Sequence, residues 1–95
     1  MGNIVITAIL RAKTGNEDQL LEVLQQVVPP SQNEIGCIKY QLHQSLDEEG
    51  VYTFYEVWQD EDSMKKHIES DHYKVYRQHS EHLVEHRDVY RLKML

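Results

Sequence analysis

Apolar and polar residues alternate along several short segments of this chain. Residues 4–12 (IVITAILRA) are rich in β-branched side chains, which predicts a strand, and apolar residues occupy both of its faces. Residues 37–44 and 51–58 flank the turn sequence SLDEEG and alternate on either side of it, which predicts the two arms of a hairpin. Residues 88–95 alternate again, so we expect a further strand there.

A helical pattern follows the first predicted strand. Asn16 is a favoured N-cap residue and Gln19 stands three positions later, so the two are expected to form a capping box. Apolar residues then recur at helical spacing, at Leu20, Leu21, Leu24, Val27 and Val28. Because proline disrupts a helix interior, we expect Pro29 and Pro30 to stop or kink this helix.

Two shorter helices are predicted after the hairpin. Asp60 is expected to cap the first, and Ser70 to cap a second helix over about 71–86. Helical spacing makes the first of these carry three residues inward: Met64, His67 and Ile68.

The order of these elements predicts the fold. Strand, helix, strand, strand, helices and strand make the split βαβ, or ferredoxin-like, motif of the α+β class, with a four-stranded antiparallel sheet in a single domain over 1–95. Helices of this motif cover one face of the sheet, yet several strands are apolar on both faces. We therefore expect the open face to pack against a second copy of the chain.

The overall composition narrows the classes of partner. The chain has 95 residues, a formal net charge of −6 and one cysteine. An acidic chain with scattered lysines and arginines is not expected to bind nucleic acid, which needs clustered basic residues. The sequence has no signal-peptide pattern and no run near the roughly 20 apolar residues of a membrane span, so we expect a cytoplasmic protein without a membrane partner.

Two segments, SQNEIGCIKYQLHQS and FYEVWQDEDSMKKHIESDHYKVY, resemble the antibiotic-biosynthesis monooxygenase domain family. The family pattern is Glu-x-Gly-Cys before a strand with Tyr, then Glu-x-Trp-x-Asp, a helical His and Ser-x-His-Tyr. The matching residues are Glu34, Gly36, Cys37, Tyr40, Glu56, Trp58, Asp60, His67, Ser70, His72 and Tyr73. The resemblance implies a homodimer of ferredoxin-like subunits whose sheets pack into an α+β barrel, with a pocket between sheet and helices in each.

The same resemblance implies a choice among activities. Some members are cofactor-free oxygenases of quinols, anthrones and other polyphenols, others degrade haem, and one branch processes a small phosphorylated signalling metabolite. Haem degradation of that kind needs an Asn, a Trp and a His ligand at positions that here hold Ala8, His67 and Arg77. Arginine cannot ligate iron, so the sequence argues against haem degradation.

His67 is the first candidate for chemistry. Its position on an apolar helix stripe directs the imidazole inward, where an unbonded histidine is costly. One interpretation is a core histidine satisfied by a backbone carbonyl or by Glu56. The other is a general base or a hydrogen bond to substrate, because histidine titrates near neutral pH.

The second arm of the hairpin places Trp58 and Phe54 on one face with Tyr52 and Glu56. These aromatic rings are either core or the flat wall of a pocket for an aromatic substrate. Glu56 lies between them and needs a partner or a raised pKa. Its candidate partners are His67, Arg77 and a tyrosine hydroxyl.

These residues form one hypothesis for a site. The catalytic group is His67 as proton acceptor, Trp58 as a wall of the pocket, and Arg77 or a tyrosine steadying a developing oxyanion. The substrate-binding group is Phe54, Glu56, Tyr52, His72, Tyr73 and Tyr76. No glycine-rich phosphate loop or dinucleotide fingerprint is present, so we expect no flavin, nicotinamide or catalytic metal cofactor.

The predicted activity is monooxygenation of an electron-rich aromatic, a quinol, anthrone or polyphenol, with molecular oxygen. Two alternatives stay open: a non-catalytic dimeric domain that binds a small ligand, and an isomerase or degrading enzyme for a small phosphorylated signalling metabolite.

Cys37 precedes a strand and has no basic neighbours, so it is not expected to be a nucleophile. Four histidines fall on one stripe of the predicted 71–86 helix, where we expect a solvated flank rather than a metal site: His72, His79, His82 and His86.

Overall fold

The computed structural model describes residues 2–95. In chain order the elements are β1 (Ile4–Ala12), α1 (Glu17–Gln32), β2 (Cys37–Gln44), β3 (Val51–Trp58), α2 (Glu61–Glu69), α3 (Asp71–Ser80), a 3-10 turn (Glu81–Leu83) and β4 (Val84–Lys93). The strands form one sheet in the order β2-β3-β1-β4, and every neighbouring pair is antiparallel. The α+β, ferredoxin-like prediction is confirmed.

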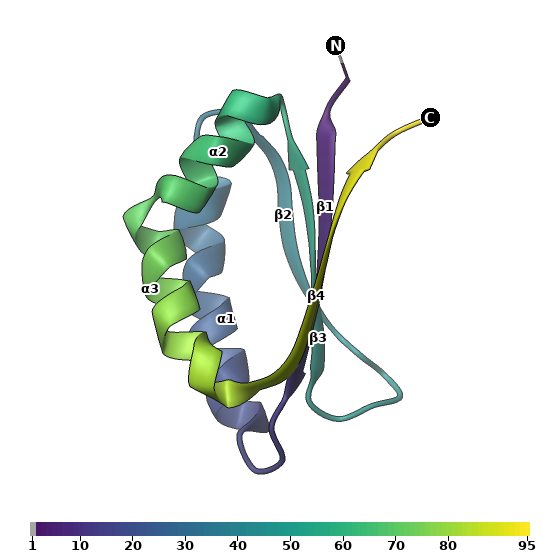
Figure 1. Cartoon of the computed structure of the whole chain (residues 1–95), viewed down its shortest axis with the longest axis vertical. Coiled ribbons are helices and arrows are strands. Elements are labelled where there is room, and N and C mark those ends of the chain that lie inside the picture. Colours follow the sequence, from purple (N-terminus) through teal and green to yellow (C-terminus); the bar gives the residue numbers. More distant parts are fainter. Residues whose placement is uncertain (1) are drawn as a thin grey trace.

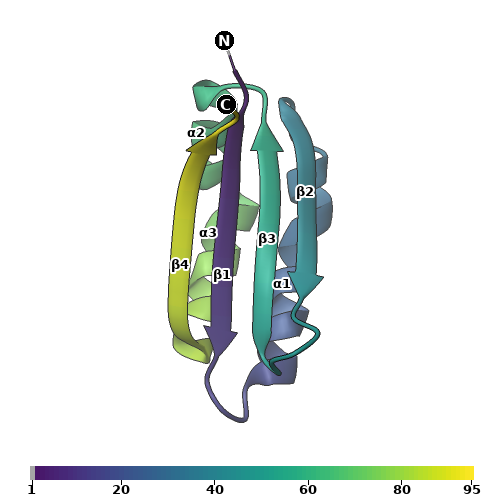
Figure 2. The ribbon, with the colours of Figure 1, turned by 90° about the vertical axis from the view of Figure 1, so that its right-hand side faces the viewer.

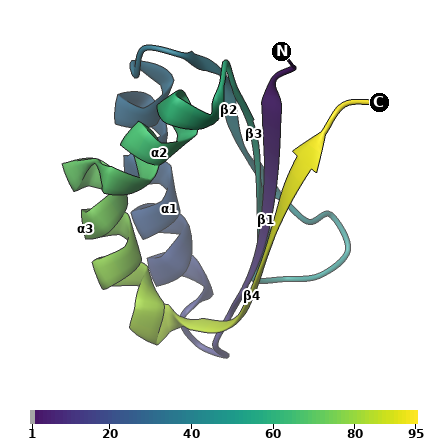
Figure 3. The same ribbon diagram turned by 45° about the horizontal axis from the view of Figure 1, so that its top comes forward.

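All three α-helices lie on one face of this sheet (Figure 1). A tilted view shows α2 and α3 beside α1 on that same side (Figure 3). Strand β3 directs Phe54 and Trp58 toward the helices, where they are 1% and 0% exposed. Leu20 and Leu24 of α1 are also fully buried and belong to the same core cluster. Met64 of α2 and Tyr76 of α3 belong to the same cluster, so the core lies between the sheet and all three helices.

The other face of the sheet is uncovered in this chain (Figure 2). Alternation and register place Ile9 of β1 on this outer face, opposite Thr53 of β3 and Asp88 of β4. Apolar side chains of three strands share the outer face: Val5, Ile9, Tyr55, Val57, Tyr90 and Leu92. Ile9, Tyr90 and Leu92 are 39%, 51% and 44% exposed, whereas Val5 and Val57 are buried, so the part of this apolar surface over β1 and β4 remains open to solvent in the single chain.

Pro29 and Pro30 were predicted to stop or kink the first helix. The prediction that they stop it is wrong. Helix α1 continues through Pro29 and Pro30 to Gln32. The two prolines remove the amide donors for the carbonyls of Gln25 and Gln26, which are exposed residues that water can solvate. The last turn is also held by the Ser31 hydroxyl, which donates to the Val27 carbonyl at 2.6 Å.

Two of the three predicted helix caps are confirmed. The Asp60 carboxylate accepts from the Ser63 amide at 2.8 Å, and the Ser70 hydroxyl accepts from the Tyr73 amide at 3.2 Å. The capping box at Asn16 is wrong, because its side chain makes no capping hydrogen bond.

The helix predicted over 71–86 is also wrong in its second half. Helix α3 ends at Ser80, and β4 begins at Val84, where the chain pairs with Ala12 of β1. Leu83 is buried and its carbonyl accepts from the Lys13 amide at 2.9 Å, so contacts with β1 override the local helical spacing. The predicted histidine stripe does not form on one helix as a result, because His86 belongs to β4.

Ile68, predicted to point inward, is 46% exposed, because α2 buries Met64 and His67 instead. Within residues 2–95, no helix combines the length and the apolarity that crossing a membrane requires.

Candidate functional site

A small cavity lies between the sheet and the helices α2 and α3. Its volume is about 80 Å³. Its apolar lining comes from the sheet, α2 and α3, and includes Ile6, Ala8, Tyr40, Phe54, Met64, Ile68 and Val89. Four groups give it polar character besides the tyrosine hydroxyls: Glu56, His67, Arg87 and Arg91. An apolar wall with a few converging polar groups is typical of a small-molecule site.

His67 is held rigidly at one end of this cavity. The residue is 2% exposed, and its ring lies 4.6 Å from the Trp58 ring and 5.0 Å from the Tyr73 ring, centroid to centroid. Nδ1 lies 2.6 Å from a carboxylate oxygen of Glu34. Nε2 is buried and has no hydrogen-bond partner among the described residues. Burial lowers the pKa of His67, which favours the neutral imidazole.

The contact with Glu34 assigns the protons on this ring. An ionised carboxylate only accepts, so Nδ1 carries the hydrogen of the neutral ring and donates it to Glu34 Oε2. Nε2 then keeps a free lone pair. A carboxylate that fixes the tautomer in this way leaves the second nitrogen as a proton acceptor.

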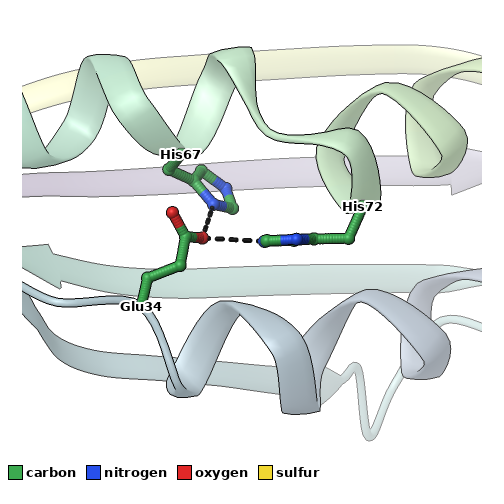
Figure 4. Close-up of side chains that lie close together, drawn as sticks. All are labelled: Glu34, His67 and His72. Atoms are coloured by element: carbon green, nitrogen blue, oxygen red, sulfur yellow. Dashed lines mark hydrogen bonds and ion pairs between the residues drawn. The ribbon is translucent and has the colours of Figure 1, made fainter.

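Glu34 also joins His72 to the cluster (Figure 4). The same oxygen, Oε2, lies 2.8 Å from Nε2 of His72 at the start of α3. Glu34 lies in the connection from α1 to β2, which Gly36 holds close to α2. Gly36 has φ +90°, and a Cβ there would lie 2.1 Å from Oγ of Ser63, so only glycine fits.

Glu56 is the second buried acid of the site. Its Oε1 accepts from the Trp58 indole N–H at 3.0 Å and lies 4.0 Å from Nε2 of His67. Burial raises the pKa of Glu56 to about 7, although the Trp58 hydrogen bond and the charge of Arg87 act in the opposite direction. Glu56 therefore exchanges its proton near neutral pH.

Arg87 of β4 is the cationic group that the sequence analysis missed. Its Nη2 donates to the Tyr73 hydroxyl at 3.2 Å, and its buried Nε has no partner among the described residues. No carboxylate is paired with it in the part of the chain described. A half-buried guanidinium with an unpartnered, buried N–H beside a cavity suits a ligand that carries negative charge.

Comparisons with known proteins agree with this fold and motif set. Residues 3–79 match the family model described as antibiotic biosynthesis monooxygenase. A Bacillus subtilis protein named "Putative monooxygenase YcnE" is 32% identical over 73 residues, which cover 77% of each protein. The chain belongs to the antibiotic biosynthesis monooxygenase family.

Three further proteins are similar to this chain over most of its length. The structure of SO0527 from Shewanella oneidensis is 31% identical with a TM-score of 0.93, covering 98% of this chain and 91% of that one. The structure of PA3566 from Pseudomonas aeruginosa is 25% identical with a TM-score of 0.95, covering 100% and 96%. The uncharacterised protein sll1783 of Synechocystis is 24% identical, and the match covers 85% of this chain and 55% of that longer protein.

The structure brings most of the predicted site residues together. Phe54, Glu56, His67, Tyr73 and Tyr76 line the cavity. Trp58 packs behind His67, and His72 reaches the site through Glu34.

Two predicted residues lie elsewhere. Arg77 lines a separate hollow with the 3-10 turn and the start of β4. The Tyr52 hydroxyl donates to the Glu17 carbonyl at 3.0 Å, on the α1 side of the core and outside the cavity lining. The cations at the cavity are therefore Arg87 and Arg91 rather than Arg77.

Glu34 and Arg87 were absent from the predicted site for different reasons. Glu34 belongs to the Glu-x-Gly-Cys motif that carries the family resemblance, so the motif was a usable signal for it. Arg87 became recognisable only when the structure placed it on a strand. Cys37, expected to be unreactive, has its pKa raised to about 11 by burial and by the nearby carboxylates of Glu34 and Glu56, which keeps it a thiol at neutral pH.

Proposed function

We propose that the chain is a cofactor-independent monooxygenase that uses molecular oxygen on an electron-rich aromatic of the quinol, anthrone or polyphenol class. The observation that carries the proposal is His67, which is fixed by Glu34 through Nδ1 and leaves Nε2 unpartnered at a cavity. A buried proton acceptor with no internal partner is suited to a proton supplied by a ligand.

Proton removal is the step that the protein has to provide. Triplet oxygen reacts slowly with closed-shell organic molecules, but a phenolate or carbanion is rich enough in electrons to transfer one to oxygen. His67 Nε2 takes the substrate proton, and the resulting radicals combine to form a C–O bond. Where the new peroxide carbon carries a hydrogen, loss of water breaks the O–O bond and leaves one oxygen atom on the substrate.

Arg87 has the complementary role in this proposal. Arg87 and Tyr73 both line the cavity, the Arg87 Nη2 donates to the Tyr73 hydroxyl, and the Arg87 Nε–H has no partner among the described residues, so these donors are available to the anion that proton removal would create. Donors already in place in a dry site stabilise developing charge without reorganisation. We therefore assign the oxyanion role to Arg87 with Tyr73, while Phe54 supplies a flat wall for the ring.

The size of the cavity restricts the substrate. At about 80 Å³ it is smaller than the roughly 150 Å³ cavity that holds benzene in an engineered protein, so a ring enters only if the walls move. Ile68 is a lining residue that is exposed to solvent, and Arg91 of β4 forms a surface ion pair with Glu61 of α2. These residues identify the solvent-exposed side of the cavity, between β4 and α2. We propose entry from that side, with single-ring quinols accepted more readily than three-ring anthrones.

We also propose that the working unit is a homodimer. The apolar outer face of the sheet, with Ile9 39% and Leu92 44% exposed, supports burial against a second copy. Each chain contains its own cavity on the helix side of the sheet, so association through the outer face leaves the site accessible.

Oxygen uptake tests the proposed activity. Metal-free protein is supplied with a panel of reduced quinols and anthrones and compared with a no-protein autoxidation blank. Uptake should exceed the blank and fall by about 10²–10⁴ in His67→Ala, the usual contribution of a general base. Met64→Ala is the matched control, since it removes a buried side chain of the same helix and cavity without removing a proton acceptor. Uptake at the blank rate, or equal losses in the two variants, contradicts the proposal.

Arg87 and Arg91 at the cavity also favour one alternative, a small phosphorylated metabolite as ligand. Binding of a phosphorylated sugar, measured by calorimetry, with no uptake on any quinol would favour that alternative.

A further inference from the structure

The Glu34–His67–His72 cluster has a use that the proposed oxygenase does not need. One carboxylate oxygen and two imidazole nitrogens lie within 4.8 Å of one another, and both rings are directed at the carboxylate (Figure 4). We propose that this cluster binds a divalent transition-metal ion of the zinc, cobalt or nickel type. Two imidazoles with one carboxylate suit these ions, whereas calcium and magnesium prefer oxygen ligands.

The present distances are near those that a bound ion requires. Glu34 Oε2 lies 2.6 Å from Nδ1 of His67 and 2.8 Å from Nε2 of His72. A tetrahedral ion with ligands at about 2.0–2.2 Å separates its ligand atoms by about 3.3 Å, so the carboxylate oxygen has to move about 0.5–0.7 Å farther from the two nitrogens. The side chains of Glu34 and His72 are 15% and 25% exposed, which gives an ion access from solvent and leaves a position for water.

A second carboxylate is placed to support the ion. In metal sites a ligating imidazole usually donates its other N–H to a carboxylate or carbonyl, which fixes the ring. A metal on Nδ1 of His67 moves the ring hydrogen to Nε2, and this nitrogen lies 4.0 Å from Glu56 Oε1. The unpartnered Nε2 of the metal-free chain thus becomes a donor facing a buried acceptor.

The bound ion has a consequence that rests on the proposed function. His67 loses the lone pair on Nε2 when Nδ1 is metallated, so metal binding and proton abstraction exclude each other. Zinc is therefore expected to inhibit oxygen uptake, while metal binding itself requires no activity.

The direct test is a cobalt titration of tag-free, chelator-treated protein, followed by visible absorption and then by displacement with zinc. One cobalt ion per chain should bind and produce ligand-field bands. His72→Ala and Glu34→Gln should each weaken binding by more than about 100-fold, above the 10–100-fold typical of changes around metal ligands. His79→Ala removes a more exposed histidine of the same helix and should bind as the wild type does.

Circular dichroism of each variant confirms folding, and Glu34→Gln decides the question if His72→Ala does not fold. Absence of a one-to-one complex, or equal weakening by His79→Ala, overturns the metal site. Oxygen uptake is measured separately with chelator and with zinc. Specific cobalt binding without uptake contradicts the oxygenase proposal alone, and uptake without cobalt binding contradicts the metal site alone.

Discussion

Replacing Glu56 with glutamine should stabilise the protein relative to the wild type, and this gain in stability should be larger at alkaline pH than at acidic pH. Glutamine mimics the protonated acid and keeps an oxygen for the Trp58 indole N–H, which now donates to Glu56 at 3.0 Å. The pKa of Glu56 is raised from 4.5 to about 7, mainly by burial. The native state therefore binds more protons than the unfolded state between these values, and wild-type stability falls as the pH rises through that window.

The size of the effect follows from the two pKa values. A difference of one pKa unit corresponds to 1.36 kcal/mol, so raising the pKa of Glu56 to about 7 costs the wild type about 3 kcal/mol above pH 7. At pH 5 most of this cost is absent, and linkage leaves about 0.8 kcal/mol. The advantage of Glu56→Gln should consequently grow by about 2.5 kcal/mol between pH 5 and pH 8.

Urea unfolding monitored by fluorescence of Trp58, the one tryptophan, measures this difference at both pH values and fixed protein concentration. The charged and titratable groups near Glu56 are Glu34, Cys37, Tyr40, His67 and Arg87, and they are present in both proteins. Glu22→Gln, at an exposed position of α1, controls for the loss of one negative charge. A difference between Glu56→Gln and the wild type that is the same at pH 5 and pH 8 would refute the raised pKa.

Two other predictions follow from the backbone and from the outer face of the sheet. Gly36→Ala should cost more stability than Gly15→Ala. Both glycines have a positive φ, but only a Cβ added at Gly36 would clash, at 2.1 Å from Oγ of Ser63. Equal urea midpoints of unfolding for the two variants would contradict this. That excess should be roughly 1–3 kcal/mol. Ile9→Asp should convert the proposed dimer to a monomer, as measured by sedimentation velocity. The control Ile35→Asp, at a 93% exposed position outside the sheet, should leave the dimer intact. A dimer that survives Ile9→Asp would rule out the outer face as its interface.

Periodicity alone was sufficient for much of the fold. The segments 4–12, 37–44 and 51–58 agree with β1, β2 and β3, because alternation repeats within each strand and depends only on near neighbours in the chain. The inward position of His67 followed in the same way from its spacing after Met64 on one helix stripe.

Local patterns failed where distant contacts outweighed them. The segment from 81 to 86 has helical spacing, yet β1 recruits it into the sheet from Val84 onward. Because the strand begins at Val84, Arg87 is a strand residue that lines the cavity. Arg77, on α3, lines a separate hollow.

The candidate site shows the same division between sequence and structure. The composition and motifs indicated a buried histidine among aromatic rings and an acid, and these residues do lie together at His67, Trp58 and Glu56. Only the tertiary structure brought Glu34 within 2.6 Å of His67, across 33 positions of sequence. That contact decides which nitrogen of His67 holds the proton, because hydrogen bonds act over a few ångströms in space regardless of separation along the chain.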